Sequence, residues 1–102
     1  MVFALASDDR GLIAFPSEAD AVAYCEFIDV EAGGWSFFAA DGSPLEPVST
    51  RRSPGYALAA DPNRTDDLRK HLGSVAYVEG CGISTVAELD QILSTAAAGG
   101  LR

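Results

Sequence analysis

The chain has 102 residues, of which 48% are apolar, and it carries 15 acidic side chains against seven Lys and Arg, giving a formal net charge of −8. This length and composition are typical of one folded domain and exclude an intrinsically disordered tail. No apolar run approaches the ~20 residues of a membrane-spanning helix, and the acidic balance argues against partners such as nucleic acid or an anionic membrane surface.

Two short apolar segments open the chain, and a capped helix follows them. Residues 2–6 and 12–15 are predicted strands joined by a polar turn. Ser17 is a predicted N-cap, because its hydroxyl can accept a hydrogen bond from a free N–H group of the first helical turn. Apolar residues at helical spacing then predict one helix that continues to the region of Glu31.

The predicted end of this helix has an unusual charge. Glu26, Asp29 and Glu31 lie there, and neither Lys nor Arg occurs between Arg10 and Arg51. Carboxylates at a helix C-terminus meet the negative end of the helix dipole, at a cost of about 0.3–1 kcal/mol each. Selection for stability alone would favour cations at these positions, so this placement indicates a functional role for the carboxylates.

An aromatic hairpin is predicted next. Residues 35–39 have high strand preference, and the Asp-Gly pair at 41–42 is a strong signal for a tight turn. Trp35 is expected in the core beneath a helix, and the alternative is an exposed anchor at an interface. Residues 45–48 form the predicted return strand, which is expected at an edge of the sheet, because the nearby prolines at 44 and 47 cannot donate to a ladder.

The second half contains two strands and a short helix. Residues 56–60 and 74–79 are predicted strands, and a short helix ending at Leu72 lies between them. Basic residues in the last turn of this helix suit its dipole. The candidate caps and first-turn acids are Asn63, Thr65, Asp66 and Asp67.

The last predicted element is a longer helix. Thr85 and Glu88 have the spacing of a capping box, with Ser84 as an alternative cap. Apolar residues then recur at helical spacing until the Gly-Gly pair at 99–100.

Together these elements predict a single α+β domain covering residues 1–102. We expect a largely antiparallel sheet of about five strands, with three helices mainly on one face.

Residues with catalytic or metal-binding chemistry are few. Cys25, Cys81 and the single histidine, His71, do not have the spacing of a zinc motif, and no glycine-rich run fits a phosphate or dinucleotide site. We therefore expect no metal, no cofactor and no enzymatic activity. Cys25 is expected to be buried, Cys81 to lie in a loop and His71 to be a solvated residue at a helix end. The first ten residues lack the basic region of a signal peptide, and the chain is expected to be cytoplasmic.

The charge imbalance lies entirely in the first half of the chain. Residues 1–50 hold nine acidic side chains against one basic side chain, whereas residues 51–102 hold six of each. A one-sided negative surface attracts cationic partners and raises their rate of association. The carboxylates predicted to bind such a partner are Asp29 and Glu31 at the centre, with Glu26, Asp41, Glu46, Asp8 and Asp9 around them.

Residues 11–48, a little over a third of the chain, resemble small bacterial immunity proteins that guard against contact-dependent growth inhibition and related polymorphic toxins. The likeness rests on the Ser-Glu-Ala helix start at 17–19, on Cys-Glu-x-Ile-Asp-Val-Glu at 25–31, and on Trp-x-Phe-Phe followed by Asp-Gly-x-Pro-Leu at 35–45. The resemblance implies a cytoplasmic protein that binds and blocks the C-terminal domain of a toxin, often a nuclease.

Charge and resemblance lead to the same hypothesis. A nuclease toxin presents Lys and Arg to bind phosphates, so an inhibitor with matching carboxylates could occlude that cleft. We therefore expect an immunity protein whose partner is a basic toxin domain. The alternatives are a small regulatory or ligand-binding subunit, or a minor enzyme that uses Cys81 or His71.

Overall fold

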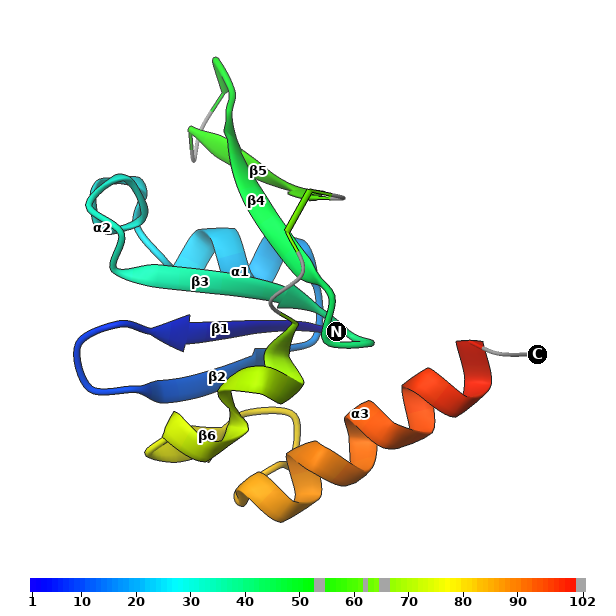
Figure 1. Cartoon of the computed structure of the whole chain (residues 1–102). Coiled ribbons are helices and arrows are strands. Elements are labelled where there is room, and N and C mark those ends of the chain that lie inside the picture. Colours follow the sequence, from blue (N-terminus) through cyan, green and yellow to red (C-terminus); the bar gives the residue numbers. More distant parts are fainter. Residues whose placement is uncertain (53–54, 62, 65–66, 101–102) are drawn as a thin grey trace.

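Six strands of the described chain form one open sheet in the order β5-β4-β3-β1-β2-β6 (Figure 1). The computed structural model describes residues 1–52, 55–61, 63–64 and 67–100. Neighbouring strands run antiparallel, except that β2 and β6 are parallel. The strands are β1 (Val2–Ala6), β2 (Gly11–Phe15), β3 (Trp35–Ala39), β4 (Pro44–Ser49), β5 (Tyr56–Ala60) and β6 (Tyr77–Glu79).

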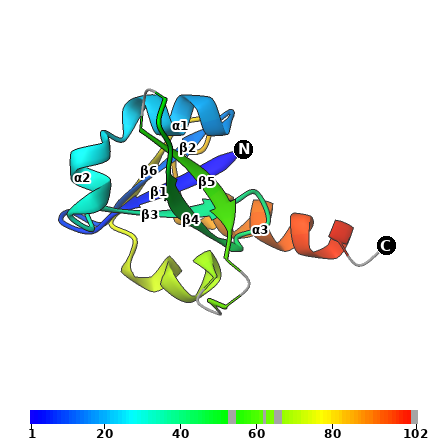
Figure 2. The ribbon, with the colours of Figure 1, turned by 90° about the horizontal axis from the view of Figure 1, so that it is seen from above.

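Helices cover both faces of this sheet. They are α1 (Glu18–Tyr24), α2 (Phe27–Glu31), the 3-10 helix η1 (Leu68–Ser74) and α3 (Val86–Gly100). Viewed from above, α1 and α2 lie on one side of the sheet, and η1 and α3 lie on the other (Figure 2). The predicted α+β class and the largely antiparallel sheet of about five strands are confirmed, and the sheet has six strands.

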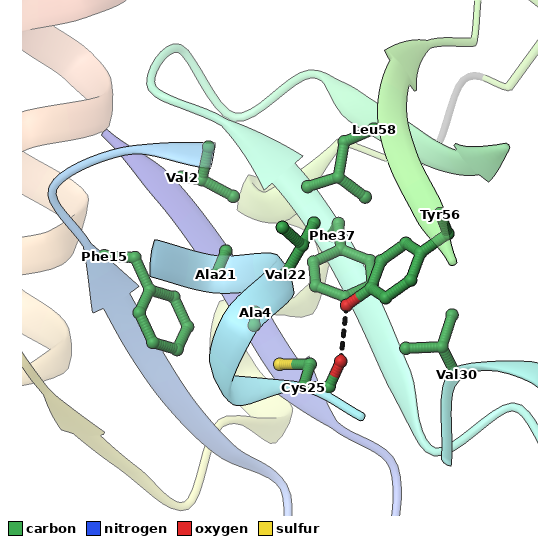
Figure 3. Close-up of a cluster of buried hydrophobic side chains, with 10 residues drawn as sticks. All are labelled: Val2, Ala4, Phe15, Ala21, Val22, Cys25, Val30, Phe37, Tyr56 and Leu58. Atoms are coloured by element: carbon green, nitrogen blue, oxygen red, sulfur yellow. Dashed lines mark hydrogen bonds between the residues drawn. The ribbon is translucent and has the colours of Figure 1, made fainter. Parts of the chain in front are cut away.

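The expectation that the helices lie mainly on one face is wrong, because the central strands are apolar on both faces. All five residues of β1 are buried. Val2 and Ala4 belong to the cluster under α1 and α2, which Figure 3 shows, whereas Phe3 and Leu5 belong to the cluster under η1 and α3. A strand buried on both faces needs a layer of helices on each.

The single helix predicted from Ser17 to Glu31 is also wrong, because the chain breaks into α1 and α2 at residues 25–26. Cys25 and Glu26 both adopt extended backbone angles. Inside the core, the Tyr56 hydroxyl donates a 2.6 Å hydrogen bond to the Cys25 carbonyl oxygen at the end of α1 (Figure 3).

This break changes the electrostatic interpretation of the acidic residues. Glu26 is the N-cap residue of α2 and Asp29 lies in its first turn, where the helix dipole favours negative charge. Among the three, Glu31 alone lies at the end of α2. Two of the three carboxylates are therefore placed favourably for the helix dipole, contrary to the prediction from the sequence. A functional role for them is supported only by their position on the surface.

The position of β4 differs from the prediction as well. It lies between β3 and β5, so β5 is the edge strand on this side of the sheet, and β6 is the edge strand on the other. The ladder from β3 to β4 has two residue pairs, Phe37 with Leu45 and Phe38 with Pro44. Pro47 lies beyond that short ladder, so it removes no hydrogen bond on the β3 side.

Several local signals are confirmed. Ser17 Oγ accepts from the Asp20 N–H at 3.2 Å. Thr85 Oγ1 accepts from the Glu88 N–H at 3.1 Å, and the Glu88 carboxylate accepts in return from the Ser84 and Thr85 hydroxyls. The cap of η1 is Asp67, a predicted first-turn acid, and not the candidate cap Asn63; Asp67 accepts from the Arg69 N–H at 3.0 Å. The candidate cap Thr65 and the first-turn acid Asp66 lie outside the described residues.

The Asp-Gly hairpin between β3 and β4 is confirmed and is packed under the second layer of helices. Gly42 has a φ of +89°, a conformation that costs glycine little. Its carbonyl oxygen accepts from the Leu68 N–H at 2.7 Å. A Cβ atom at Gly42 would lie 3.2 Å from the Leu93 side chain of α3.

Candidate functional site

Five of the seven predicted binding residues lie at one end of the sheet. Two of them are in the β1–β2 turn, and three are on or next to α2; both elements lie at the same end in Figures 1 and 2. Backbone contacts hold these elements together: Ser7 N–H donates to Gly34 O at 2.9 Å, and Ser7 Oγ donates to Gly33 O at 2.9 Å. We call this group of exposed carboxylates the acidic end; it consists of Asp8, Asp9, Glu26, Asp29 and Glu31.

The other two predicted residues lie elsewhere. Asp41 is in the β3–β4 turn, at the opposite end of β3. Its carboxylate accepts from Ser43 Oγ at 2.6 Å and from Ser43 N–H at 2.9 Å, and these bonds are the main reason that its pKa is lowered, with the nearby Arg69 contributing in the same direction. Glu46 is exposed on β4, opposite Ala59 of the edge strand. The structure thus does not place all seven on one surface.

A pocket lies in the acidic end. It has a volume of about 230 Å³, and two of its lining residues, Asp8 and Asp29, come from segments that are distant in the sequence. The remaining lining residues are Ala6, Ser7, Gly34 and Trp35.

Tight backbone packing forms this pocket. Gly34 N–H donates to Asp29 O at 2.8 Å. A Cβ atom at Gly34 would lie 2.9 Å from that oxygen, so a larger residue would force α2 and β3 apart. Trp35 starts β3 opposite Ala6 of β1, and both residues line the pocket.

One aromatic residue, Trp35, lines the pocket, and it contacts a second aromatic ring. Trp35 is half-buried, and the ring of Tyr24 meets it edge-on at a centroid distance of 6.2 Å. Tyr24 is 59% exposed and Tyr77 is 46% exposed. The expected core position of Trp35 is confirmed in part, because the indole packs on the core under α1 and α2 and also lines the pocket. Partly exposed Trp and Tyr are the residues most often found at interaction hot spots.

Asp9 joins the β1–β2 turn to β6. Its carboxylate accepts from the Gly11 N–H at 2.9 Å and from the Tyr77 hydroxyl at 2.9 Å. The Gly11 bond, and then the Tyr77 bond, lower the pKa of Asp9, and the same contact with Asp9 raises the pKa of Tyr77. The Tyr77 ring occupies the space over Gly11, where a Cβ atom would lie 2.2 Å from the ring. Asp9 therefore positions the turn that carries Asp8.

Basic residues border the acidic end. Arg10 is in the same turn as Asp8, with a φ of +60°, and its guanidinium donates to Ser74 Oγ of η1 at 2.6 Å. The loop that carries Arg51 and Arg52 returns through Gly55, where a Cβ atom would lie 3.1 Å from the ring of Phe27 on α2.

The residues considered for catalysis lie away from this site. His71 is half-buried, with its ring 5.6 Å from that of Phe38, and is not the solvated residue expected. The carboxylate of Asp67, which precedes it in the chain, accepts from the Arg69 N–H and lies 4.0 Å from Arg69 Nε. Cys81 is exposed in the loop before α3, as expected, and its thiol lies 3.5 Å from the Ala14 carbonyl oxygen.

Cys25 is buried, as predicted. Burial is the main reason that the pKa of its thiol rises to about 12, and the negative charge of Asp29 acts in the same direction.

Sequence reasoning missed three contributors to the site. Gly34 and Ser7 form the pocket through backbone contacts, and Tyr77 fixes Asp9 from a strand near the other end of the chain. The Gly-Gly pair before Trp35 is a signal that could have indicated the close approach of α2 and β3. No local pattern marks Ser7 or Tyr77, because their partners are more than 25 residues away.

Within the described ranges, no cluster of three or more His, Cys, Asp or Glu side chains is placed to hold a metal ion. In the same part of the chain, no helix has both the length and the apolar character needed to cross a membrane. Comparisons with protein-family models, with curated proteins and with solved structures gave no match to this chain.

Proposed function

We propose that this protein is a non-enzymatic inhibitor that binds a basic protein domain through the acidic end. The observation that carries the proposal is the meeting of Asp8 and Asp29 at one pocket beside Trp35, with more carboxylates on the same short helix. In the terms of the sequence resemblance, the protein would be an immunity protein, and its partner the C-terminal domain of a toxin, for example a nuclease. It would act in the cytoplasm.

Charge and aromatic anchors would have separate roles in this complex. The negative field would steer a cationic domain toward the acidic end and raise the association rate. Trp35 and Tyr24 would then supply contact area at the centre of the interface, where aromatic side chains contribute most to affinity. A nuclease held in this way would have its phosphate-binding side chains covered by carboxylates and could not bind its substrate.

The test begins with the partner. The tagged protein is used to capture binding proteins from the cells in which its gene is native, and a captured protein is then expressed alone in a second host. The proposal predicts that this protein carries a basic domain, that it stops growth, and that co-expression of the present chain restores growth. Capture of partners without a basic domain, or growth arrest that co-expression does not relieve, would contradict the proposal.

Two matched variants locate the interface. In the first, Asp8→Asn, Asp29→Asn and Glu31→Gln remove three charges from the acidic end. In the second, Glu18→Gln, Glu46→Gln and Asp90→Asn remove three exposed charges elsewhere. Both variants have the same net charge, so a loss of protection confined to the first assigns the effect to the acidic end. Equal loss in both would show that only total charge matters.

A further inference from the structure

We infer that the pocket formed by Asp8, Asp29 and Trp35 is a binding site for a single guanidinium group, and that its occupant is an arginine side chain of the protein partner. This inference rests on the proposed function for the identity of the occupant. The chemistry that recognises the group is a property of the pocket itself and can be tested without the partner.

The size of the pocket suits one side chain. At about 230 Å³ it is smaller than the roughly 300–1,000 Å³ of sites for drug-sized ligands and cofactors. It would hold several water molecules, each of which takes about 30 Å³ in the liquid. A pocket of this size can admit the end of a long side chain that enters from a partner's surface.

The residues that line the pocket favour a positively charged occupant. Asp8 and Asp29 are exposed acidic residues that both line the pocket, so its negative charge favours a cationic occupant. One Asp8 oxygen accepts from the Asp9 N–H at 2.7 Å, which fixes the direction of that side chain. The nearest basic residue in sequence, Arg10, extends its guanidinium to Ser74 of η1.

The indole ring favours guanidinium over ammonium. A guanidinium group is planar, stacks on an aromatic face and can donate to two carboxylates at once, whereas an ammonium group is a compact and strongly hydrated charge. Tyr24 meets Trp35 edge-on, and this contact supports the indole ring beside the pocket.

The walls of the pocket are already in position. Gly34 N–H is bonded to Asp29 O, Ser7 N–H is bonded to Gly34 O, and Ser7 Oγ is bonded to Gly33 O. These bonds join the end of β1, the end of α2 and the start of β3. A preformed site loses little conformational entropy when its ligand binds.

The experiment uses the full chain and a small probe, N-acetyl-arginine amide. Trp35 is the only tryptophan, so its fluorescence reports on the pocket directly. We expect a saturable change in the millimolar range of the probe. The neutral isostere, N-acetyl-citrulline amide, should give no saturable change, and N-acetyl-lysine amide should bind at least about threefold more weakly.

Variants assign the response to the pocket. The double variant Asp8→Asn with Asp29→Asn should weaken binding of the arginine probe at least about fivefold, whereas Glu18→Gln with Asp90→Asn should leave it unchanged. The inference is overturned by an equal response to the citrulline probe, by equal affinity for the lysine probe, or by unchanged binding in the pocket variant. The citrulline and lysine comparisons need no variant, so they hold even if a substitution disturbs folding.

The result separates this inference from the proposed function. If the probe does not bind but the captured partner still depends on the acidic end, the pocket assignment fails and the proposed function stands. If the probe binds and the captured proteins have no basic domain, the proposed function fails and the guanidinium site stands, with its occupant still to be identified.

Discussion

Replacement of Tyr56 by Phe tests the contact that holds the end of α1 in place. The Tyr56 side chain is 2% exposed, and its hydroxyl donates a 2.6 Å hydrogen bond to the carbonyl oxygen of Cys25. Burial raises the pKa of Tyr56 to about 12, with the Cys25 thiol contributing in the same direction, so the phenol keeps its proton at neutral pH. Phe keeps the ring, which stacks on Phe27 at 5.8 Å and lies 6.1 Å from Phe37.

The expected cost follows from what the substitution leaves behind. Because the ring packing is retained, the main effect is a buried carbonyl group that has lost its donor, at a cost of about 1–3 kcal/mol. A central value of about 2 kcal/mol corresponds to a fall in melting temperature of roughly 8–16 °C for a domain of this size. Urea unfolding followed by circular dichroism gives the free energy of unfolding, and a thermal scan gives the melting temperature.

A matched control isolates the hydrogen bond. Tyr24→Phe removes a hydroxyl from a ring that is 59% exposed, and it should change the free energy of unfolding by less than about 0.5 kcal/mol. A Tyr56→Phe variant that is as stable as the Tyr24→Phe variant would refute the stabilising role of the bond between β5 and the end of α1.

Three further predictions test other parts of the structure. Gly80→Ala should destabilise the protein by at least about 2 kcal/mol in urea unfolding, because φ is +95° and a Cβ atom would lie 2.2 Å from the Ala14 carbonyl oxygen. Gly73→Ala, where a Cβ atom meets nothing within 4 Å, is the control and should be close to neutral. A thiol reagent at about pH 8 should modify the exposed Cys81 of the folded protein but not Cys25, whose buried thiol has a pKa of about 12; reaction of both thiols before unfolding would contradict the packing of α1. Stability should fall in acid, because the pKa values of Asp9, Asp41 and Glu88 are lowered in the folded state from 3.8, 3.8 and 4.5. Their contribution is complete above those unfolded values and is lost as the pH falls through the lowered ones, so an unchanged urea midpoint between about pH 6 and pH 2.5 would refute these contacts.

The sequence predicts most of the features that depend on residues near one another in the chain. The Ser17 cap, the Thr85–Glu88 capping box and the Asp-Gly hairpin at 41–42 are all confirmed, because each needs partners within four residues. The strands of the sheet can also be located from the sequence, because their apolar residues form short runs that are bounded by turn residues.

The errors have physical causes that the local pattern hides. The break between α1 and α2 occurs where Tyr56, 31 residues away, bonds the Cys25 carbonyl oxygen. The second layer of helices is indicated by the unbroken apolar run at 2–6, which is typical of a strand buried on both faces. That signal is present in the sequence, but the neighbouring hairpin pattern favours a sheet with one solvated face.

Charge counting predicts part of the candidate site. The excess of acids in the first half of the chain includes five residues that the structure gathers at one end and two that it does not. Asp41 lies one strand length away because β3 runs from Trp35 to the turn at 41–42. The pocket itself could not be predicted, because it depends on bonds from Ser7 to Gly33 and Gly34.

The most direct test of the acidic end as a docking surface is the association rate of the captured basic partner, measured against salt concentration for the two matched triple variants. We predict that Asp8→Asn with Asp29→Asn and Glu31→Gln lowers the rate at low salt about tenfold or more and flattens its dependence on salt. We also predict that Glu18→Gln with Glu46→Gln and Asp90→Asn changes the rate by less than about twofold. Equal rates and equal salt dependence in the two variants would contradict docking at the acidic end.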